Sequence, residues 1–300
     1  MTVRIAAFPK CYLEAMMPPR RMSWLDWIEL AAGLPHVHGL EAYPPALDSL
    51  EPDYLCEMQA AAGSRGLAIP MMCASPDFTR PDPTERAAEI ERQRAVIDAT
   101  AELGGEFCRV LSGQRWPGVT REQGIAWTVQ AIEGLLPAAE RRGVTLTMEN
   151  HYKDGFWEYP EFAQASDIFL EVIGQIDSPW FGVNFDPSNA LIAGDDPVAL
   201  LNQVKDRVVT MHASDRSLAG GTLDDLRRHD ADPVLGYAPY VQHGVIGHGL
   251  IDYDAIFQVL KGVGFDSWIS IEDGQDPEVG IQNLAESAEF LHGKVLEYGL

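Results

Sequence analysis

The chain has few cysteines, few basic residues and no long apolar run. No uninterrupted stretch of about 18 apolar residues occurs, so we expect no segment that spans a membrane. The opening residues, MTVRIAAFPK, lack the apolar core and cleavage pattern of a secretory signal. The four cysteines are scattered without a CxxC pair, which favours reduced thiols over a disulfide frame or a zinc cluster. These absences predict a cytoplasmic protein.

The chain also has few positively charged residues. The chain has 22 Lys and Arg residues against 45 Asp and Glu residues, and its formal net charge is −23. Such a surface repels phosphate backbones, so we expect no nucleic-acid partner. A local basic pocket stays compatible with this charge, and solubility is its simplest explanation.

The residues that are present alternate short apolar runs with longer amphipathic segments. This alternation is typical of a parallel α/β sheet, and 300 residues suit one (β/α)₈ TIM barrel. A doubly wound open sheet is the rival, but Phe8 is followed by Pro9-Lys10-Cys11 and not by a Gly-rich phosphate turn. We therefore predict a single barrel domain over residues 1–300. Its eight expected strands are Val3–Phe8, His38–Tyr43, Leu67–Cys73, Phe107–Leu111, Val144–Glu149, Phe181–Asp186, Val208–His212 and Trp268–Glu272.

Two other segments give local predictions. Thr120-Arg-Glu-Gln123 has the spacing of a capping box, and it opens a helical pattern that ends near Gly143. A long region from about residue 216 to 249 follows the seventh strand and is rich in Gly, Asp and His. Loops on that face of a barrel build active sites, so we expect this irregular loop to cover the substrate.

Four consecutive strands end in potential metal ligands: Glu149, Asp186, His212 and Glu272. Taken singly, each has an ordinary interpretation: a salt-bridged acid, a turn or a hydrogen-bonded core histidine. Together they would meet at one barrel mouth, where unpaired acids repel each other strongly. The pattern therefore predicts one divalent cation, and this oxygen-rich set suits Mn²⁺, Mg²⁺ or Co²⁺ better than a structural zinc.

The strand ends MENH, NFDPSN, MHASDR and WISIEDG, with GHGLIDYDAIFQVLKGVGF before the last, resemble the xylose isomerase-like barrel superfamily of sugar phosphate isomerases and epimerases. The resemblance covers nearly the whole chain and is strongest from about Gly143 to Gly274. It implies a metal site at the ends of strands five to eight, with Mn²⁺ expected first and Mg²⁺, Co²⁺ or Zn²⁺ also compatible. It also implies a sugar or keto-sugar substrate, and it is compatible with a homo-oligomer.

By this resemblance, the chain is a metal-dependent isomerase or epimerase. The metal polarises a carbonyl group and stabilises an enediolate, while Glu149 and Glu272 remove and return the proton. Arg216, in the Asp215-Arg216 step, matches a substrate-binding arginine, and we expect both residues to contact substrate. A surface ion pair is the competing interpretation for Arg216.

Two positions depart from the ketose 3-epimerase pattern. Asn189 stands where those enzymes carry a histidine after the strand-six Asp, and we assign it to substrate binding. His151 lies two residues beyond Glu149 and shares its direction if the strand continues. It is a candidate general base near neutral pH, or else a hydrogen-bond donor to the substrate.

Three alternatives stay open. The Glu149-Asn150-His151 triplet resembles the large subunit of C-glycoside deglycosidases, lyases that perform β-elimination on 3-keto glycosides and require a small partner subunit. An enzyme like endonuclease IV is remote, because it needs more histidines and a basic groove. A sugar-binding barrel without catalysis is the last. Loop aromatics able to stack on a sugar or an aglycone are Tyr12, Tyr43, Trp116, Phe156 and Trp157.

Overall fold

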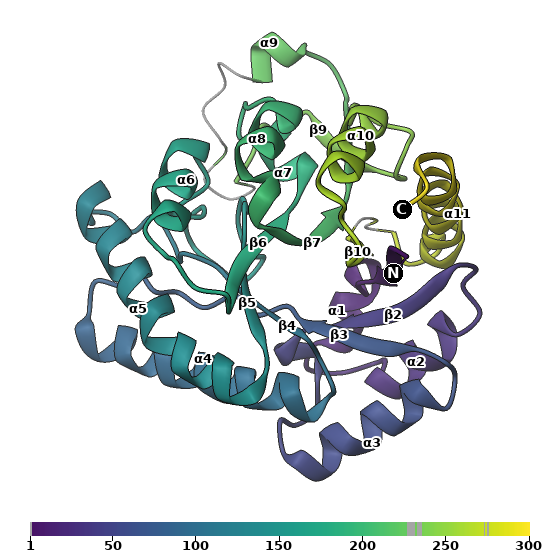
Figure 1. Ribbon diagram of the computed structural model, residues 1–300, viewed down its shortest axis with the longest axis horizontal. Coiled ribbons are helices and arrows are strands. Elements are labelled where there is room, and N and C mark those ends of the chain that lie inside the picture. Colours follow the sequence, from purple (N-terminus) through teal and green to yellow (C-terminus); the bar gives the residue numbers. More distant parts are fainter. Residues whose placement is uncertain (1, 227–231, 233–235, 273, 275) are drawn as a thin grey trace.

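Parallel strands close into a barrel in the computed structural model, which describes residues 2–226, 232, 236–272, 274 and 276–300. Hydrogen bonding orders the strands β1-β10-β7-β6-β5-β4-β3-β2 (Figure 1). The predicted TIM barrel is confirmed, and the doubly wound sheet was the wrong alternative. The barrel strands are β1 (Arg4–Ala7), β2 (Val37–Ala42), β3 (Ala68–Met72), β4 (Phe107–Val110), β5 (Thr145–Glu149), β6 (Phe181–Phe185), β7 (Val208–Ala213) and β10 (Trp268–Ile271).

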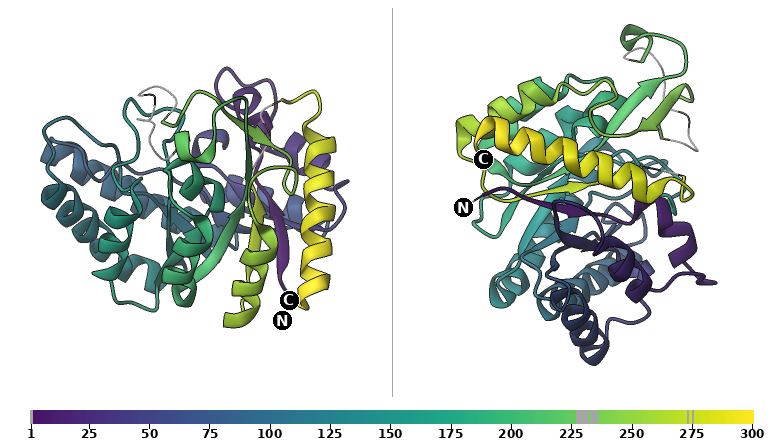
Figure 2. Two further views of the ribbon diagram at one scale, coloured as in Figure 1. Left: turned by 90° about the horizontal axis from the view of Figure 1, so that it is seen from above. Right: turned by 90° about the vertical axis from the view of Figure 1, so that its right-hand side faces the viewer.

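Helices surround the strands, and α11 packs on β1 and β10 beside the chain's two ends (Figure 2). Among the helices of the described residues, none combines the length and apolar character needed to cross a membrane. The longer helices are α2 (Trp24–Ala31), α3 (Pro52–Gly63), α4 (Pro83–Glu102), α5 (Arg121–Arg142), α6 (Ser166–Gly174), α7 (Pro187–Ile192), α8 (Pro197–Val204), α10 (Tyr253–Val263) and α11 (Gly280–Tyr298). The short ones are η1 (Lys10–Tyr12), α1 (Leu13–Met16), η2 (Pro44–Ala46), η3 (Lys205–Arg207) and α9 (Leu223–Leu226).

Trp268 fills the end of the barrel where the strands begin. Its side chain is buried, and the Arg4 guanidinium lies over its ring, 4.0 Å from the centroid. Gly39 on β2 makes room for it, because a Cβ there would come 2.9 Å from the indole. With this end plugged, the opposite end, where the strands finish, is the one that holds polar chemistry.

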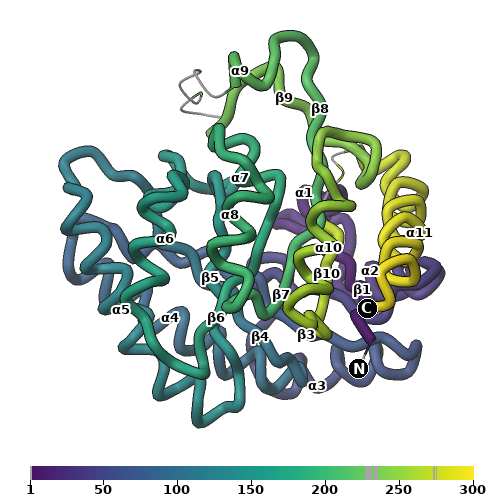
Figure 3. Tube along the Cα trace, turned by 45° about the horizontal axis from the view of Figure 1, so that its top comes forward, coloured from purple at the N-terminus to yellow at the C-terminus, as the bar shows by residue number. Residues whose placement is uncertain are grey.

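The region after β7 was predicted to be one irregular loop, but the structure has regular elements there. It contains the antiparallel strands β8 (Asp215–Leu218) and β9 (Val241–Gly244), which stand out from the barrel rim with α9 (Figure 3). These four-residue strands are too short to show a period in a Gly-rich sequence, which explains the error. Residues 227–231 and 233–235 of the predicted loop lie outside the described residues.

The capping box predicted for α5 is confirmed. The Thr120 hydroxyl oxygen accepts the Gln123 N–H at 3.2 Å, and the Gln123 side-chain oxygen accepts the Thr120 N–H at 3.1 Å. The helix ends at Gly143, whose φ of 67° lies in the left-handed region that glycine adopts without strain.

Replacing Thr120 with alanine should lower the free energy of unfolding by about 1 kcal/mol, because one amide of the first turn loses its acceptor. Urea denaturation followed by circular dichroism measures this loss. Thr120→Ser keeps the hydroxyl and should stay within a few tenths of a kcal/mol of the native chain. Equal stability of the alanine variant and the native chain would contradict the capping role.

Candidate metal centre and active site

The four predicted metal ligands meet at the end of the barrel where the strands finish. Glu149 ends β5, Asp186 follows β6, His212 lies in β7 and Glu272 follows β10. Each is buried and offers a ligand atom, and these atoms all lie within 4.8 Å of one another. Nδ1 of His212 lies 3.4 Å from Glu149 Oε1 and 3.1 Å from Glu272 Oε2. The structure therefore brings together all four residues singled out from the sequence.

Two atoms of this cluster indicate that a cation fits. Asp186 Oδ2 and His212 Nδ1 are buried and have no hydrogen-bond partner within the described residues. The other Asp186 oxygen is fully used, since it accepts the N–H groups of Ser188 and Asn189 and the hydroxyl of Ser214. Burial raises the pKa of Asp186, and the charges of Glu149 and Glu272 raise it further. A divalent ion would satisfy both bare atoms and offset the crowded negative charge.

Arg109 is a functional residue that the sequence analysis missed. It lies buried in β4, and its Nη1 donates to Glu149 Oε2 at 2.7 Å. Its Nε donates to the Ala74 carbonyl oxygen at 3.1 Å, and its Nη2 donates to Ser75 Oγ at 3.0 Å. Burial opposes ionisation of Glu149, but the charges of His212 and Arg109 outweigh it and lower its pKa to about 2. Glu149 is therefore held as a carboxylate.

Glu272 has a different neighbour, Lys10, which the sequence analysis also missed. Lys10 lies in η1 directly after β1, and its Nζ is 3.5 Å from Glu272 Oε1. Burial would raise the pKa of Glu272, but Lys10 and then His212 lower it well below its usual range. Glu272 is thus a second carboxylate beside Nδ1 of His212.

His151 lies beside the cluster and contacts a buried acid. Its Nδ1 is 3.6 Å from Glu161 Oε2, and its ring stacks on Tyr152 with centroids 5.1 Å apart. The other oxygen of Glu161 accepts the N–H and the hydroxyl of Ser112. Burial would lower the pKa of His151, but the Glu149 charge and the Glu161 contact outweigh burial and raise it.

The three residues predicted to bind substrate have different surroundings. Asn189 lies in α7 and donates from Nδ2 to Glu149 Oε1 at 2.9 Å, so it contacts a candidate metal ligand. Arg216 is fully buried, and its charge lowers the pKa of Asp186, which places it near the acid cluster. The Asp215 carboxylate accepts backbone N–H groups of Gly247, Gly249 and Ile251. Asp215 therefore organises the segment after β9.

A cavity of about 670 Å³ opens beside the cluster. Its inner wall carries the polar residues Lys10, Arg109, His151 and Glu272. Two of the expected aromatics, Tyr43 and Phe156, line it as well. Others lie elsewhere: Tyr12 packs on Trp27, and the Trp116 indole donates to Asp77. A cavity of this size, lined by apolar and charged side chains, is typical of a small-molecule site.

Comparisons with known proteins agree with this arrangement. The model of the xylose isomerase-like TIM barrel family matches residues 25–293. An inosose dehydratase from Clostridium beijerinckii is 25% identical over 144 residues, which cover 47% of this chain and 44% of that protein. The chain thus aligns with about half the length of the curated relatives it first matches.

Solved structures share the complete barrel at low sequence identity. A D-tagatose 3-epimerase-like protein superposes with a TM-score of 0.76 at 17% identity, covering 99% of this chain and 98% of that one. The IolI protein, solved with a zinc atom, gives 0.73 at 17% identity with the same coverage of 99% and 98%. At such identities, the likeness shows the fold alone.

Proposed function

This chain belongs to the xylose isomerase-like TIM barrel family, and from that premise we propose that it is a divalent-metal-dependent enzyme acting on a keto-sugar or a related polyhydroxy ketone. The reaction begins with removal of a proton next to the carbonyl group. The observation that carries this proposal is the buried Glu–Asp–His–Glu cluster, with two unsatisfied ligand atoms, beside a cavity of sugar-compatible size.

Glu149, Asp186, His212 and Glu272 would hold the ion. When bound, it polarises the carbonyl group, acidifies the neighbouring C–H and stabilises the enediolate. Manganese was the first expectation from the sequence, but the comparisons give no support for it. A structural neighbour carries zinc, and a carboxylate-rich set with one imidazole accepts several divalent ions. The proposal is therefore a divalent site whose metal is to be identified by measurement.

Glu272 is the better placed of the two candidate proton carriers. Glu272 lines the cavity beside Lys10, whereas Glu149 does not line it and accepts hydrogen bonds from Arg109 and Asn189. The sequence interpretation shared the proton transfer between both glutamates. From the contacts, we assign Glu272 to remove the proton and Glu149 to anchor Arg109 and the metal.

His151 is another polar residue that lines the cavity, and its Nδ1 lies 3.6 Å from the Glu161 carboxylate. In an epimerase or isomerase, the proton returns to carbon and His151 donates a hydrogen bond to the substrate oxygen. In a dehydratase, the C–H electrons form a C=C bond, the neighbouring C–O bond breaks, and His151 gives its proton to the departing hydroxide. The inosose dehydratases among the relatives favour this second outcome as an alternative.

Two alternatives from the sequence analysis are related to this proposal. A C-glycoside deglycosidase would share the first proton removal, and an enzyme like endonuclease IV would share the barrel fold. A C-glycoside deglycosidase would expel an aglycone in place of hydroxide and would co-purify with a small β-rich subunit. A repair enzyme like endonuclease IV would need a basic groove, which a net charge of −23 disfavours. Homo-oligomer formation and a partner subunit stay predictions.

The test combines elemental analysis of the purified protein with proton–deuterium exchange, followed by NMR, into a panel of ketoses, inososes and 3-keto glycosides. We expect about one divalent ion per chain and exchange of one carbon-bound proton in a responsive substrate. Glu272→Gln should slow that exchange by about 10²-fold, since it removes the proton acceptor. The NMR product spectrum then separates epimerisation from loss of water.

Glu297→Gln is the matched control for that variant, because Glu297 is an exposed acid on α11 that pairs with Lys294 and does not line the cavity. It should leave exchange unchanged. A native chain that binds no divalent metal under any loading condition would refute the proposed function. Full exchange by Glu272→Gln would refute the assignment of Glu272.

A further inference from the structure

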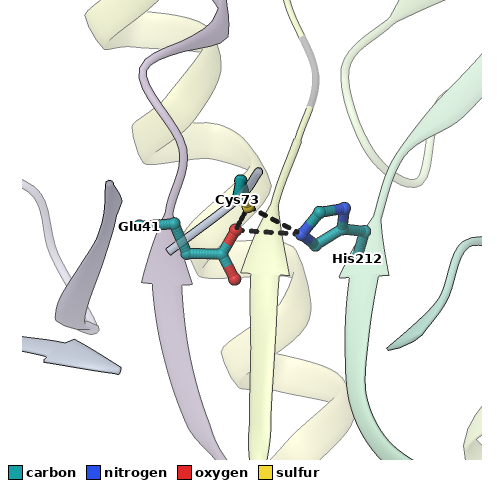
Figure 4. Close-up of side chains that lie close together, drawn as sticks. All are labelled: Glu41, Cys73 and His212. Carbon is teal, nitrogen blue, oxygen red and sulfur yellow. Dashed lines mark hydrogen bonds and ion pairs between the residues drawn. The ribbon is translucent and has the colours of Figure 1, made fainter. Parts of the chain in front are cut away.

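His212 presents its two ring nitrogens to different groups. Nδ1 faces Glu149 and Glu272 of the candidate metal site, at 3.4 and 3.1 Å. Nε2 faces the opposite way and lies 2.9 Å from Oε2 of Glu41 (Figure 4). Glu41 lies on β2, on the far side of the barrel interior, and was not identified from the sequence.

Cys73, which follows β3, completes this contact. Its Sγ–H donates to the same Glu41 oxygen at 2.9 Å, and its sulfur lies 3.8 Å from His212 Nε2 (Figure 4). Glu41 is 1% exposed, and the other two side chains are fully buried. A buried carboxylate needs such donors, because burial without them costs several kcal/mol.

The distances separate the roles of the two nitrogens. An N–H donor and a carboxylate oxygen 2.9 Å apart make an ordinary hydrogen bond. Ligand atoms around one ion stand farther apart, about 3.4 Å for a tetrahedral shell with bonds near 2.1 Å. Nε2 makes the shorter contact, at 2.9 Å, whereas Nδ1 has no hydrogen-bond partner among the described residues, although Glu272 Oε2 lies 3.1 Å away. Nε2 is therefore the nitrogen placed to donate to Glu41, and Nδ1 is the nitrogen that faces the metal position.

We propose that Glu41 is a positioning residue that accepts the Nε2–H of His212 and thereby fixes the tautomer and ring orientation needed for metal binding at Nδ1. Cys73 holds the Glu41 carboxylate in place. This inference rests on the metal site of the proposed function. Without Glu41, the imidazole proton is free to move to Nδ1, where it would block the ligand lone pair.

The experiment measures Zn²⁺ affinity by competition with a chromophoric chelator. Glu41→Ala should bind Zn²⁺ 10–100-fold more weakly than the native chain. Glu41→Gln keeps an acceptor oxygen without the charge, so it should show a smaller loss. Proton–nitrogen NMR of the metal-free native chain with labelled histidine, at a pH where the imidazole is neutral, should show His212 protonated at Nε2, and the Glu41→Ala spectrum should lose this preference.

Two control variants separate positioning from general destabilisation. Leu40→Val alters the neighbouring β2 residue, which is fully buried in the core, and should lower stability while leaving Zn²⁺ affinity unchanged. Cys73→Ser retains a donor to the Glu41 carboxylate and should therefore bind Zn²⁺ much more tightly than Glu41→Ala does.

Native Zn²⁺ affinity in Glu41→Ala would overturn the inference while leaving the metal site, and so the proposed function, intact. A second Zn²⁺ equivalent that disappears in Cys73→Ala would also overturn it, because Glu41, Cys73 and His212 would then be metal ligands themselves. Absence of any metal from the native chain would instead refute the proposed function.

Discussion

Replacing Arg109 with leucine is expected to lower the free energy of unfolding of the metal-free protein by about 3–5 kcal/mol. Arg109 and Glu149 form a buried pair at 2.7 Å, with side chains 3% and 0% exposed. The variant would leave the Glu149 carboxylate buried without the cation that donates directly to it, and it would remove the donors to Ala74 and Ser75. Urea denaturation in the presence of a chelator measures the loss without stabilisation from the metal.

Two further variants identify the cause of this loss. Arg109→Lys keeps the positive charge but lacks the planar guanidinium group with its several N–H donors. It should therefore recover only part of the lost stability. The double variant Arg109→Leu/Glu149→Leu removes both charges and should be more stable than Arg109→Leu alone, because an apolar pair needs no compensation. If Arg109→Leu matches the native chain, the buried pair makes no contribution to stability.

The barrel was predictable because its strands share one simple signal. Each strand is a short apolar run that is followed by polar residues. The predicted range of β5 began at Val144, and the observed strand begins one residue later, at Thr145. Parallel strands that are buried on both faces form continuous apolar segments in the sequence. Their number and their order along the chain can therefore be predicted from a single sequence. The β8–β9 pair has no such signal, since its four-residue strands, DRSL and VQHG, each contain a single large apolar residue.

The convergence of the four candidate metal ligands was predictable for a related reason. Their positions at consecutive strand ends imply that they converge, whatever the details of packing. Arg109 and Glu41 could not be placed in the same way, because their partners lie 40 and 171 residues away in the chain. A weak signal existed in each case: a single charged residue inside an otherwise apolar strand. Such a residue requires a buried partner, but the sequence does not say which one.

Asp215 has a structural role that the sequence did not suggest, while its contact with substrate stays a prediction. Its place beside Arg216 suggested a contact with substrate, whereas its oxygens accept backbone N–H groups from residues more than thirty positions later. The GHGLI segment supplies these donors, and a Cβ at Gly249 would lie 2.1 Å from the Asp215 oxygen. The Asp215-Arg216 step therefore contains one residue, Asp215, that organises a loop, and one residue, Arg216, that lies near the acid cluster.

Stripping the metal from the loaded protein should reduce proton–deuterium exchange by at least about 10³-fold, since a bound cation supplies several kcal/mol of stabilisation to the developing negative charge. The same treatment should lower the free energy of unfolding. A ligand at 1,000 times its dissociation constant stabilises the native state by about 4 kcal/mol. Dialysis against a chelator, followed by exchange and thermal-unfolding measurements, tests both effects.

Reloading with Zn²⁺, Mn²⁺, Mg²⁺ or Co²⁺ separately identifies the working ion. The ion that restores exchange need not be the one that stabilises the fold most, because affinity follows the ligand set, whereas activity requires an open coordination position. Asp186→Asn serves as the control: it retains an oxygen at the site but removes a charge, so each ion should stabilise it less than the native chain. Full exchange and an unchanged melting temperature after stripping would mean that the cluster of carboxylates and His212 works without a metal.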